Sequence, residues 1–162
     1  MTRSKTRGSP DIVIRELTGT DTSLMHALLD LFGRAFDQTD VYGDARPDEE
    51  YLGELLDARH FVALVAMDGS SVVGGLAAYE LVKFEQRRSE IYLYDLAVDS
   101  AWRRQGVATQ LIQALRNIAA GRGAWVVFVQ ADVGDEPAIA LYDALGVRED
   151  VLHFDIPVAR GR

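Results

Sequence analysis

The 162-residue chain contains no cysteine, and this absence excludes disulfide bonds, thiolate nucleophiles and cysteine metal sites. No apolar run approaches the length of a transmembrane helix, so we expect no membrane contact. The three histidines lack the spacing of metal ligands, and we expect no metal. Residues 1–10 are basic but lack the apolar stretch of a secretory signal, which predicts a flexible tail and a cytoplasmic protein.

Positive charge is scarce in the rest of the chain. The formal net charge is −8 at pH 7, although residues 1–10 carry three basic side chains and no carboxylate. An acidic body argues against nucleic-acid binding and favours a cationic partner, because a field of one sign concentrates the opposite charge. Solubility is the alternative reason for this acidity. Apolar residues make up 48% of the chain, which is enough for one domain over residues 11–162.

The hydrophobic pattern predicts six strands and four helices in an α+β order. Strands are predicted at residues 12–17, 61–67, 71–81, 90–98, 125–131 and 151–156, and helices at 24–35, 47–56, 107–120 and 137–145. The turn signal Asp68-Gly69 predicts antiparallel pairing, whereas the helix from Val107 joins two parallel strands. We therefore expect a single mixed, mostly antiparallel sheet with helices on both faces and a buried strand at 125–131.

A basic, glycine-containing turn, Arg103-Arg104-Gln105-Gly106-Val107-Ala108, stands between a predicted strand and a predicted helix. Free amides and the positive dipole end at a helix start bind anions, and glycine removes the Cβ that would keep a phosphate away. An ordinary surface loop is the alternative. The two parallel strands should splay, leaving a cofactor cleft where residues 96–98 offer backbone groups to an extended pantetheine-like chain.

These residues resemble the GNAT superfamily of acetyl-CoA-dependent N-acetyltransferases. The resemblance lies in Arg103-x-x-Gly106-x-Ala108 and in the later stretch from Ala138 through Tyr142 to Gly146. It implies a GNAT-like fold, acetyl-CoA as co-substrate and a homodimer. The cofactor-binding residues that it implies are Leu96, Ala97, Val98, Arg103, Arg104, Gln105, Gly106, Val107, Ala108 and Thr109.

A narrower set of segments is similar to the aminoglycoside 3-N-acetyltransferases of the gentamicin-resistance type. These segments are residues 84–86, 89–95, 130–132 and 153–155. The similarity implies an aminoglycoside as the cationic small-molecule substrate and a role in antibiotic resistance. Holding such a polycation requires several carboxylates, although each one alone is equally explained as a solvated loop charge. The predicted substrate-binding residues are Glu90, Tyr94, Asp132, Asp135, Glu136 and Asp155.

Two residues are predicted to be catalytic. Asp95, a carboxylate inside an apolar strand, is the candidate base, acting directly or through water; structural pairing with Arg87 or Arg88 is the alternative. Strand alternation places Tyr94 and Glu90, a reserve base, on the opposite face from Asp95. By resemblance, the Tyr142 phenol meets the departing thiolate, and packing on the sheet is its alternative role.

Other functions stay open at this level. The same catalyst could act on a polyamine, a protein lysine or an N-terminus, and a non-catalytic acyl-CoA-binding module is a further alternative. A phosphate-loop nucleotide enzyme is excluded, because the chain has no Gly-x-x-x-x-Gly-Lys-Ser/Thr pattern.

Overall fold

A computed structural model describes residues 11–159, so the tail expected at residues 1–10 lies outside the described residues. The chain divides into two compact units, with the boundary between Gln130 and Ala131. The elements of the first unit are β1 (Val13–Glu16), α1 (Thr22–Ala35), α2 (Thr39–Gly43), α3 (Glu49–Asp57), β2 (Phe61–Asp68), β3 (Ser71–Val82), β4 (Ser89–Val98), the 3-10 helix η1 (Ser100–Trp102), α4 (Val107–Arg122) and β5 (Ala124–Val129). The second unit contains α5 (Glu136–Leu145).

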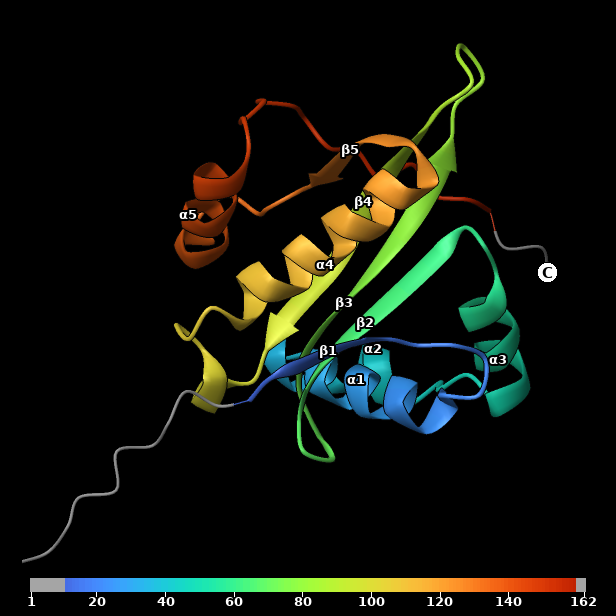
Figure 1. The fold of residues 1–162 in the computed structure, drawn as a ribbon, viewed down its shortest axis with the longest axis vertical. Helices are drawn as coiled ribbons and strands as arrows, with labels where there is room; N and C mark the ends of the chain where they lie inside the picture. The colour runs from blue at the N-terminus through green and yellow to red at the C-terminus, as the bar shows by residue number, and fades with distance from the viewer. Residues whose placement is uncertain (1–10, 160–162) are drawn as a thin grey trace, which may run out of the picture. The chain divides into compact units, whose positions relative to one another are not determined.

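The first unit is built on a five-stranded sheet in the order β1-β2-β3-β4-β5 (Figure 1). The first three pairs of neighbours are antiparallel, and β4 and β5 are parallel. Parallel neighbours need a long connection, which α4 supplies here. The prediction of a mixed, mostly antiparallel sheet is confirmed.

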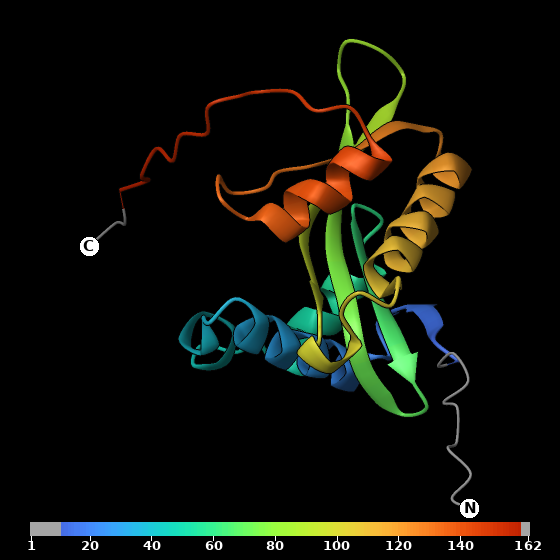
Figure 2. The same ribbon diagram turned by 90° about the vertical axis from the view of Figure 1, so that its left-hand side faces the viewer.

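Helices cover both faces of this sheet, as predicted. Figure 2 shows α4 on one side of the strands and α1 with α2 on the other. Leu111 and Leu115 of α4 are fully buried, and so is Leu28 of α1. Each such burial contributes roughly 1.5–3 kcal/mol, so the helices are held by their apolar faces.

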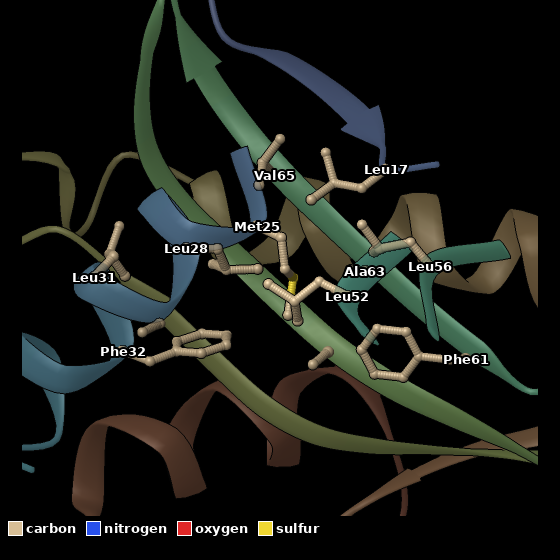
Figure 3. Packing of buried hydrophobic residues seen from close by; sticks show 12 residues of the cluster. Leu17, Met25, Leu28, Leu31, Phe32, Leu52, Leu56, Phe61, Ala63 and Val65 are labelled. Carbon is tan, nitrogen blue, oxygen red and sulfur yellow. The ribbon is translucent and has the colours of Figure 1, made fainter. Parts of the chain in front are cut away.

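The larger core cluster joins α1 and α3 to the sheet (Figure 3). Phe32 of α1 and Leu52 of α3 are among its most buried members. The helix α1 approaches the strands closely at Gly75, where an added Cβ would contact a methyl group of Leu28 and lie 2.7 Å from the Leu64 carbonyl oxygen. Glycine at this position therefore lets α1 pack directly on the backbone of β3.

Two predictions for the C-terminal third are wrong. The strand expected to be buried at 125–131 is β5, which pairs only with β4 among the described strands, and Trp125 is 70% exposed. An edge strand has one unpaired side, so an apolar run alone does not secure burial. Residues 151–156 form no strand, because an alternating pattern requires a neighbouring strand edge before it becomes a ladder.

The structure also contains the short helix α2, which the hydrophobic pattern did not indicate. It follows α1 after a tight turn in which Asp37 takes a positive φ of 53° and the Gln38 amide donates to the Gly33 carbonyl at 2.9 Å. Five residues are too few to show helical periodicity. In the described range, no helix is both long and apolar enough to cross a bilayer.

Candidate active site

The parallel strands β4 and β5 pair over only part of their length. The last matched pair is Leu93 with Val129, whereas β3 continues to pair with β4 up to Val98. Residues 94–98 therefore have no strand partner on the β5 side within the described chain. The opening predicted beside residues 96–98 thus corresponds to a stretch of β4 that has no described strand partner toward β5, although the Val98 carbonyl accepts from the Arg103 Nε.

The turn after β4 is shaped by two left-handed residues. Arg104 has φ 60°, and Gly106, the N-cap of α4, has φ 79° with nothing within 4 Å of an added Cβ. No side chain in the described residues caps the first amides of α4. Left-handed residues that turn successive amides to one side form an anion-binding concavity, and the helix dipole adds to it. Two left-handed residues and uncapped helix amides are compatible with the anion cradle that the sequence predicts, and anion binding there stays a prediction.

One member of this turn has an additional contact. The Arg103 Nε donates to the Val98 carbonyl at 3.1 Å, which ties the turn back to the end of β4. Arg103 and Arg104 are both exposed, so their remaining guanidinium donors face solvent. The residues predicted to hold the cofactor thus lie together at the junction of β4 and α4, and their binding role stays a prediction.

A pocket of about 200 Å³ lies on the face of the sheet that α1 and α3 cover. Its walls are apolar and aromatic side chains from α1, α2, α3 and three strands, and its one carboxylate is Asp95. The lining residues are Met25, Leu29, Phe32, Tyr42, Pro47, Tyr51, Leu52, Leu55, Phe61, Ala77, Tyr79, Tyr94 and Asp95. The pocket can receive a small organic group and offers it a single negative charge.

Tyr94 and Asp95 both line this pocket, so the predicted placement of Tyr94 on the opposite face is wrong. The reason is a β-bulge in β4. Ala77 pairs with Asp95 and Ala78 pairs with Leu93, which leaves Tyr94 as an extra residue. A bulge interrupts the alternation of side chains, and it directs two successive residues of β4 into one pocket.

Asp95 is half-buried and accepts a hydrogen bond from the Tyr42 hydroxyl at 3.0 Å. Burial raises the pKa of the Asp95 carboxyl, and the Tyr42 hydrogen bond lowers it in part. The alternative pairing with Arg87 or Arg88 is wrong. Neither arginine forms an ion pair with Asp95 in the described chain, and Arg88 contacts Glu85 at 3.5 Å and Glu90 at 3.8 Å instead. Sequence reasoning missed Tyr42, since a contact across 53 positions leaves no local signal.

Glu90, the reserve base, is engaged elsewhere. Its carboxylate lies 3.7 Å from the Lys83 ammonium in addition to its contact with Arg88. It is not among the residues that line the pocket. These charge partners favour a structural role for Glu90 at the start of β4.

The second unit holds the remaining predicted residues. Asp135 caps α5 by accepting from the Ala138 amide at 3.3 Å, and Glu136 stands in the first turn. Burial, and then the nearby charge of Asp135, raise the pKa of Tyr142 to about 12. Asp132 is exposed, and Asp155 is exposed beside His153, 3.0 Å away. Their roles toward cofactor and substrate stay predictions.

A further acidic segment, overlooked in the sequence, supplies part of the pocket wall. Residues 37–54 contain seven exposed carboxylates, namely Asp37, Asp40, Asp44, Asp48, Glu49, Glu50 and Glu54. Arg46 is the only basic residue in this stretch, and it is paired with Asp30. Tyr42 and Tyr51 from the same stretch line the pocket, so the segment that carries these carboxylates also forms part of the pocket wall.

Comparison with known proteins agrees with this geometry. The acetyltransferase (GNAT) family model matches residues 25–147. The chain is similar to the crystal structure of an aminoglycoside acetyltransferase from an uncultured soil metagenomic sample, with 54% identity, a TM-score of 0.90, and coverage of 92% of this chain and 99% of that chain. A second aminoglycoside acetyltransferase from such a sample, solved in complex with sisomicin, has 33% identity, a TM-score of 0.85 and coverage of 91% and 97%.

Among curated proteins, N-alpha-acetyltransferase 30 of Schizosaccharomyces pombe is 30% identical over 86 residues, which are 52% of this chain and 55% of that protein. The chain matches about half the length of the curated relatives or less.

Proposed function

The chain belongs to the acetyltransferase (GNAT) family, and from this premise we propose that it transfers the acetyl group of acetyl-CoA to an amino group of an aminoglycoside antibiotic, at the 3-amino position. The 3-amino assignment rests on the resemblance of its acceptor-side segments alone. The observation that carries the proposal is the position of Asp95. This carboxylate lines the pocket on one face of β4 and lies within residues 94–98, whose edge has no partner toward β5 among the strands that the structure describes.

Acetyl-CoA fits the residues at the junction of β4 and α4. Its diphosphate requires amides and positive charge, which the turn from Arg103 to Thr109 supplies, and Gly106 leaves the approach open. Its pantetheine arm requires strand-like hydrogen bonds, which residues 96–98 can offer. The thioester brought there supplies an activated acetyl carbonyl.

In the proposed reaction, the amine first loses a proton to Asp95, directly or through a water molecule. The nitrogen lone pair then attacks the thioester carbonyl carbon, the carbon–sulfur bond breaks, and the sulfur leaves with the electron pair. The nitrogen releases its second proton as the bond breaks, and that proton neutralises the departing thiolate. From the family resemblance alone, we propose the Tyr142 phenol as a hydrogen-bond donor to that sulfur. No covalent enzyme intermediate is required, which agrees with a chain that has no cysteine.

The acceptor side suits a polycation. Asp95 is a carboxylate in an aromatic pocket, where ammonium groups also interact with the faces of tyrosine rings. Residues 37–54, which carry seven exposed carboxylates, also supply Tyr42 and Tyr51 to the pocket wall, and we propose that these carboxylates form an acidic rim around it. An aminoglycoside carries several ammonium groups on rigid rings, so it can engage the pocket and this acidic rim together.

The direct experiment is mass spectrometry after incubation with acetyl-CoA and a panel of amines. The panel contains gentamicin, sisomicin, kanamycin, spermidine and a short peptide with a free N-terminus. A mass increase of one acetyl group on the aminoglycosides alone, with fragmentation locating it on the 3-amino group, supports the proposal. Acetylation of spermidine or the peptide, and not of the aminoglycosides, would overturn the aminoglycoside assignment. The proposal that the chain is an N-acetyltransferase would still stand.

The matched control is Asp95→Asn, which keeps the size of the side chain and removes its basicity. We expect a loss of roughly 10²–10⁴-fold in turnover, the usual contribution of a positioned base. Because burial raises the pKa of Asp95, the wild-type rate should fall as the pH drops through that raised pKa and protonates the base. An unchanged turnover number across pH in Asp95→Asn would remove Asp95 from the mechanism.

A further inference from the structure

The Tyr42 hydroxyl connects two distant parts of the first unit at the candidate base. Tyr42 lies on α2, Asp95 lies on β4, and the hydroxyl donates to the Oδ2 of Asp95 at 3.0 Å. A hydrogen bond at one oxygen restrains the orientation of a carboxylate and leaves its other oxygen as an acceptor for an incoming amine. Tyr42 is therefore placed to control how Asp95 meets the substrate.

Aromatic packing holds Tyr42 in this place. Its ring lies 5.9 Å from the rings of Phe32 and Phe36, which stack on each other at 5.5 Å. The backbone of α2 comes close to α1 at Gly33, where an added Cβ would lie 3.3 Å from the Cα of Thr39. The ring is thus clamped by α1, and the hydroxyl has little freedom to leave Asp95.

Among the described residues that line the pocket around Asp95, no basic side chain competes with Tyr42 in stabilising the Asp95 carboxylate. The other titratable groups that line the pocket are Tyr51 of α3, Tyr79 of β3 and Tyr94 of β4, and the α1 side chains there are apolar. No lysine, arginine or histidine is among the lining residues in the described chain. A hydrogen bond from a neutral phenol is then the means by which this pocket stabilises the ionised carboxylate.

We propose that Tyr42 is a positioning residue that holds ionised Asp95 in one orientation, with Oδ1 presented to the amine of the substrate. Its catalytic consequence rests on the proposed function, but the interaction itself does not. The Tyr42 hydrogen bond lowers the pKa of Asp95 against the effect of burial. Loss of this hydrogen bond should therefore raise the pKa of Asp95, so that a higher pH is needed to ionise the carboxyl.

The test is Tyr42→Phe, which removes the hydroxyl and keeps the ring beside the stacked rings of Phe32 and Phe36. The Asp95 carboxyl is followed by NMR titration of protein labelled with ¹³C at aspartate Cγ, and its signal is assigned by its absence in Asp95→Asn. We expect the titration midpoint to move to higher pH in Tyr42→Phe. The matched control is Tyr51→Phe, which also lines the pocket but has no hydrogen bond to Asp95, and which should leave the midpoint in place.

A second readout links the interaction to catalysis. The acidic limb of kcat/KM for gentamicin should shift upward in Tyr42→Phe by the same amount as the NMR midpoint. Incorporation of 3-fluorotyrosine at position 42 gives a stronger donor of nearly the same size, so both midpoints should shift downward there. This opposite sign keeps the test decisive even if Tyr42→Phe folds poorly.

The outcomes separate the two proposals. Shifts in the NMR midpoint without acetylation of any aminoglycoside would overturn the proposed function and support the role of Tyr42 at Asp95. The role of Tyr42 would be overturned if the enzyme acetylates an aminoglycoside but the NMR midpoint and the acidic limb of kcat/KM are the same with tyrosine, phenylalanine and 3-fluorotyrosine at position 42. A purely structural role would lower stability and leave both midpoints unchanged.

Discussion

Replacing Gly106 with alanine should separate acetyl-CoA binding from folding, with Gly123→Ala as its matched control. Both glycines flank α4, with φ values of 79° and 73°, and an added Cβ would meet nothing within 4 Å at either. The two sites differ in position, because α4 has 16 residues and is therefore about 24 Å long. Gly106 lies at the cradle end, whereas Gly123 lies at the far end.

The cost in stability should be equal at the two sites. A left-handed conformation costs an L-residue about 1–2 kcal/mol, and no steric clash adds to it at either position. For a chain of this size, each kcal/mol lowers Tm by roughly 2–4 °C. At Gly106 alone, relaxation of the strained φ would also turn the first amides of α4 away from the diphosphate. Loss of one such charge-assisted hydrogen bond corresponds to about a 10-fold weaker Kd or more.

Calorimetric titration with coenzyme A and thermal denaturation measure these two effects on the same samples. We expect Gly106→Ala and Gly123→Ala to lose similar Tm, with weaker coenzyme A binding only in Gly106→Ala. Equal Kd values in the two variants and the wild type would refute the assignment of the diphosphate to the start of α4. Weakened coenzyme A binding in both variants would show that strain at either end of α4 reduces binding. That result would also contradict the assignment of the diphosphate to the start of α4.

Three other changes test separate parts of the molecule. Gly75→Ala should destabilise the fold by about 1–3 kcal/mol in chemical denaturation, because its Cβ meets the Leu64 carbonyl, and no loss would contradict the close packing of α1. Tyr142→Phe should lower kcat roughly 10²-fold with little change in the KM of the amine. Because the pKa of Tyr142 is raised to about 12, the wild-type phenol should stay protonated throughout an assay at pH 6–9. An unchanged rate in Tyr142→Phe would remove Tyr142 from the mechanism. The double change Asp40→Asn with Asp44→Asn should raise the KM for gentamicin by up to about fivefold at low salt and have no effect at 0.5 M salt, whereas a salt-independent change would argue against a screened acidic rim.

Local sequence signals were sufficient where neighbours along the chain determine the structure. The sequence predicts a tight turn from Arg103 to Ala108 between a strand and a helix, and the structure has such a turn with left-handed backbone at Arg104 and Gly106; its binding of an anion stays a prediction. The glycine at the helix start and the basic pair beside it act over only a few residues, so the local sequence is enough to predict the backbone of this turn. The mixed sheet was predictable for the same reason, because hairpin turns and a crossover helix determine which neighbours pair.

The acceptor side was only partly predictable. The sequence singled out Asp95 because a carboxylate is unusual in an apolar strand. It did not indicate which residues would surround Asp95. The placement of Tyr94 failed at a β-bulge, and a bulge depends on how two strands share hydrogen bonds rather than on their sequence alone. The expected strand at 151–156 failed because alternation describes one strand and not the edge with which it must pair.

The sequence by itself thus determined the α+β order, the glycine-containing turn before α4 and the identity of one carboxylate in an apolar strand, since each depends on residues within about one turn or one strand. Tertiary structure alone decided that Tyr42 would donate to Asp95 and that Tyr94 would share the pocket of Asp95. It also decided that the stretch 37–54 would supply part of the wall of that pocket. These contacts join residues far apart in the chain, and they are set by how α1 and α2 pack on the sheet. No spacing rule along a sequence encodes such packing.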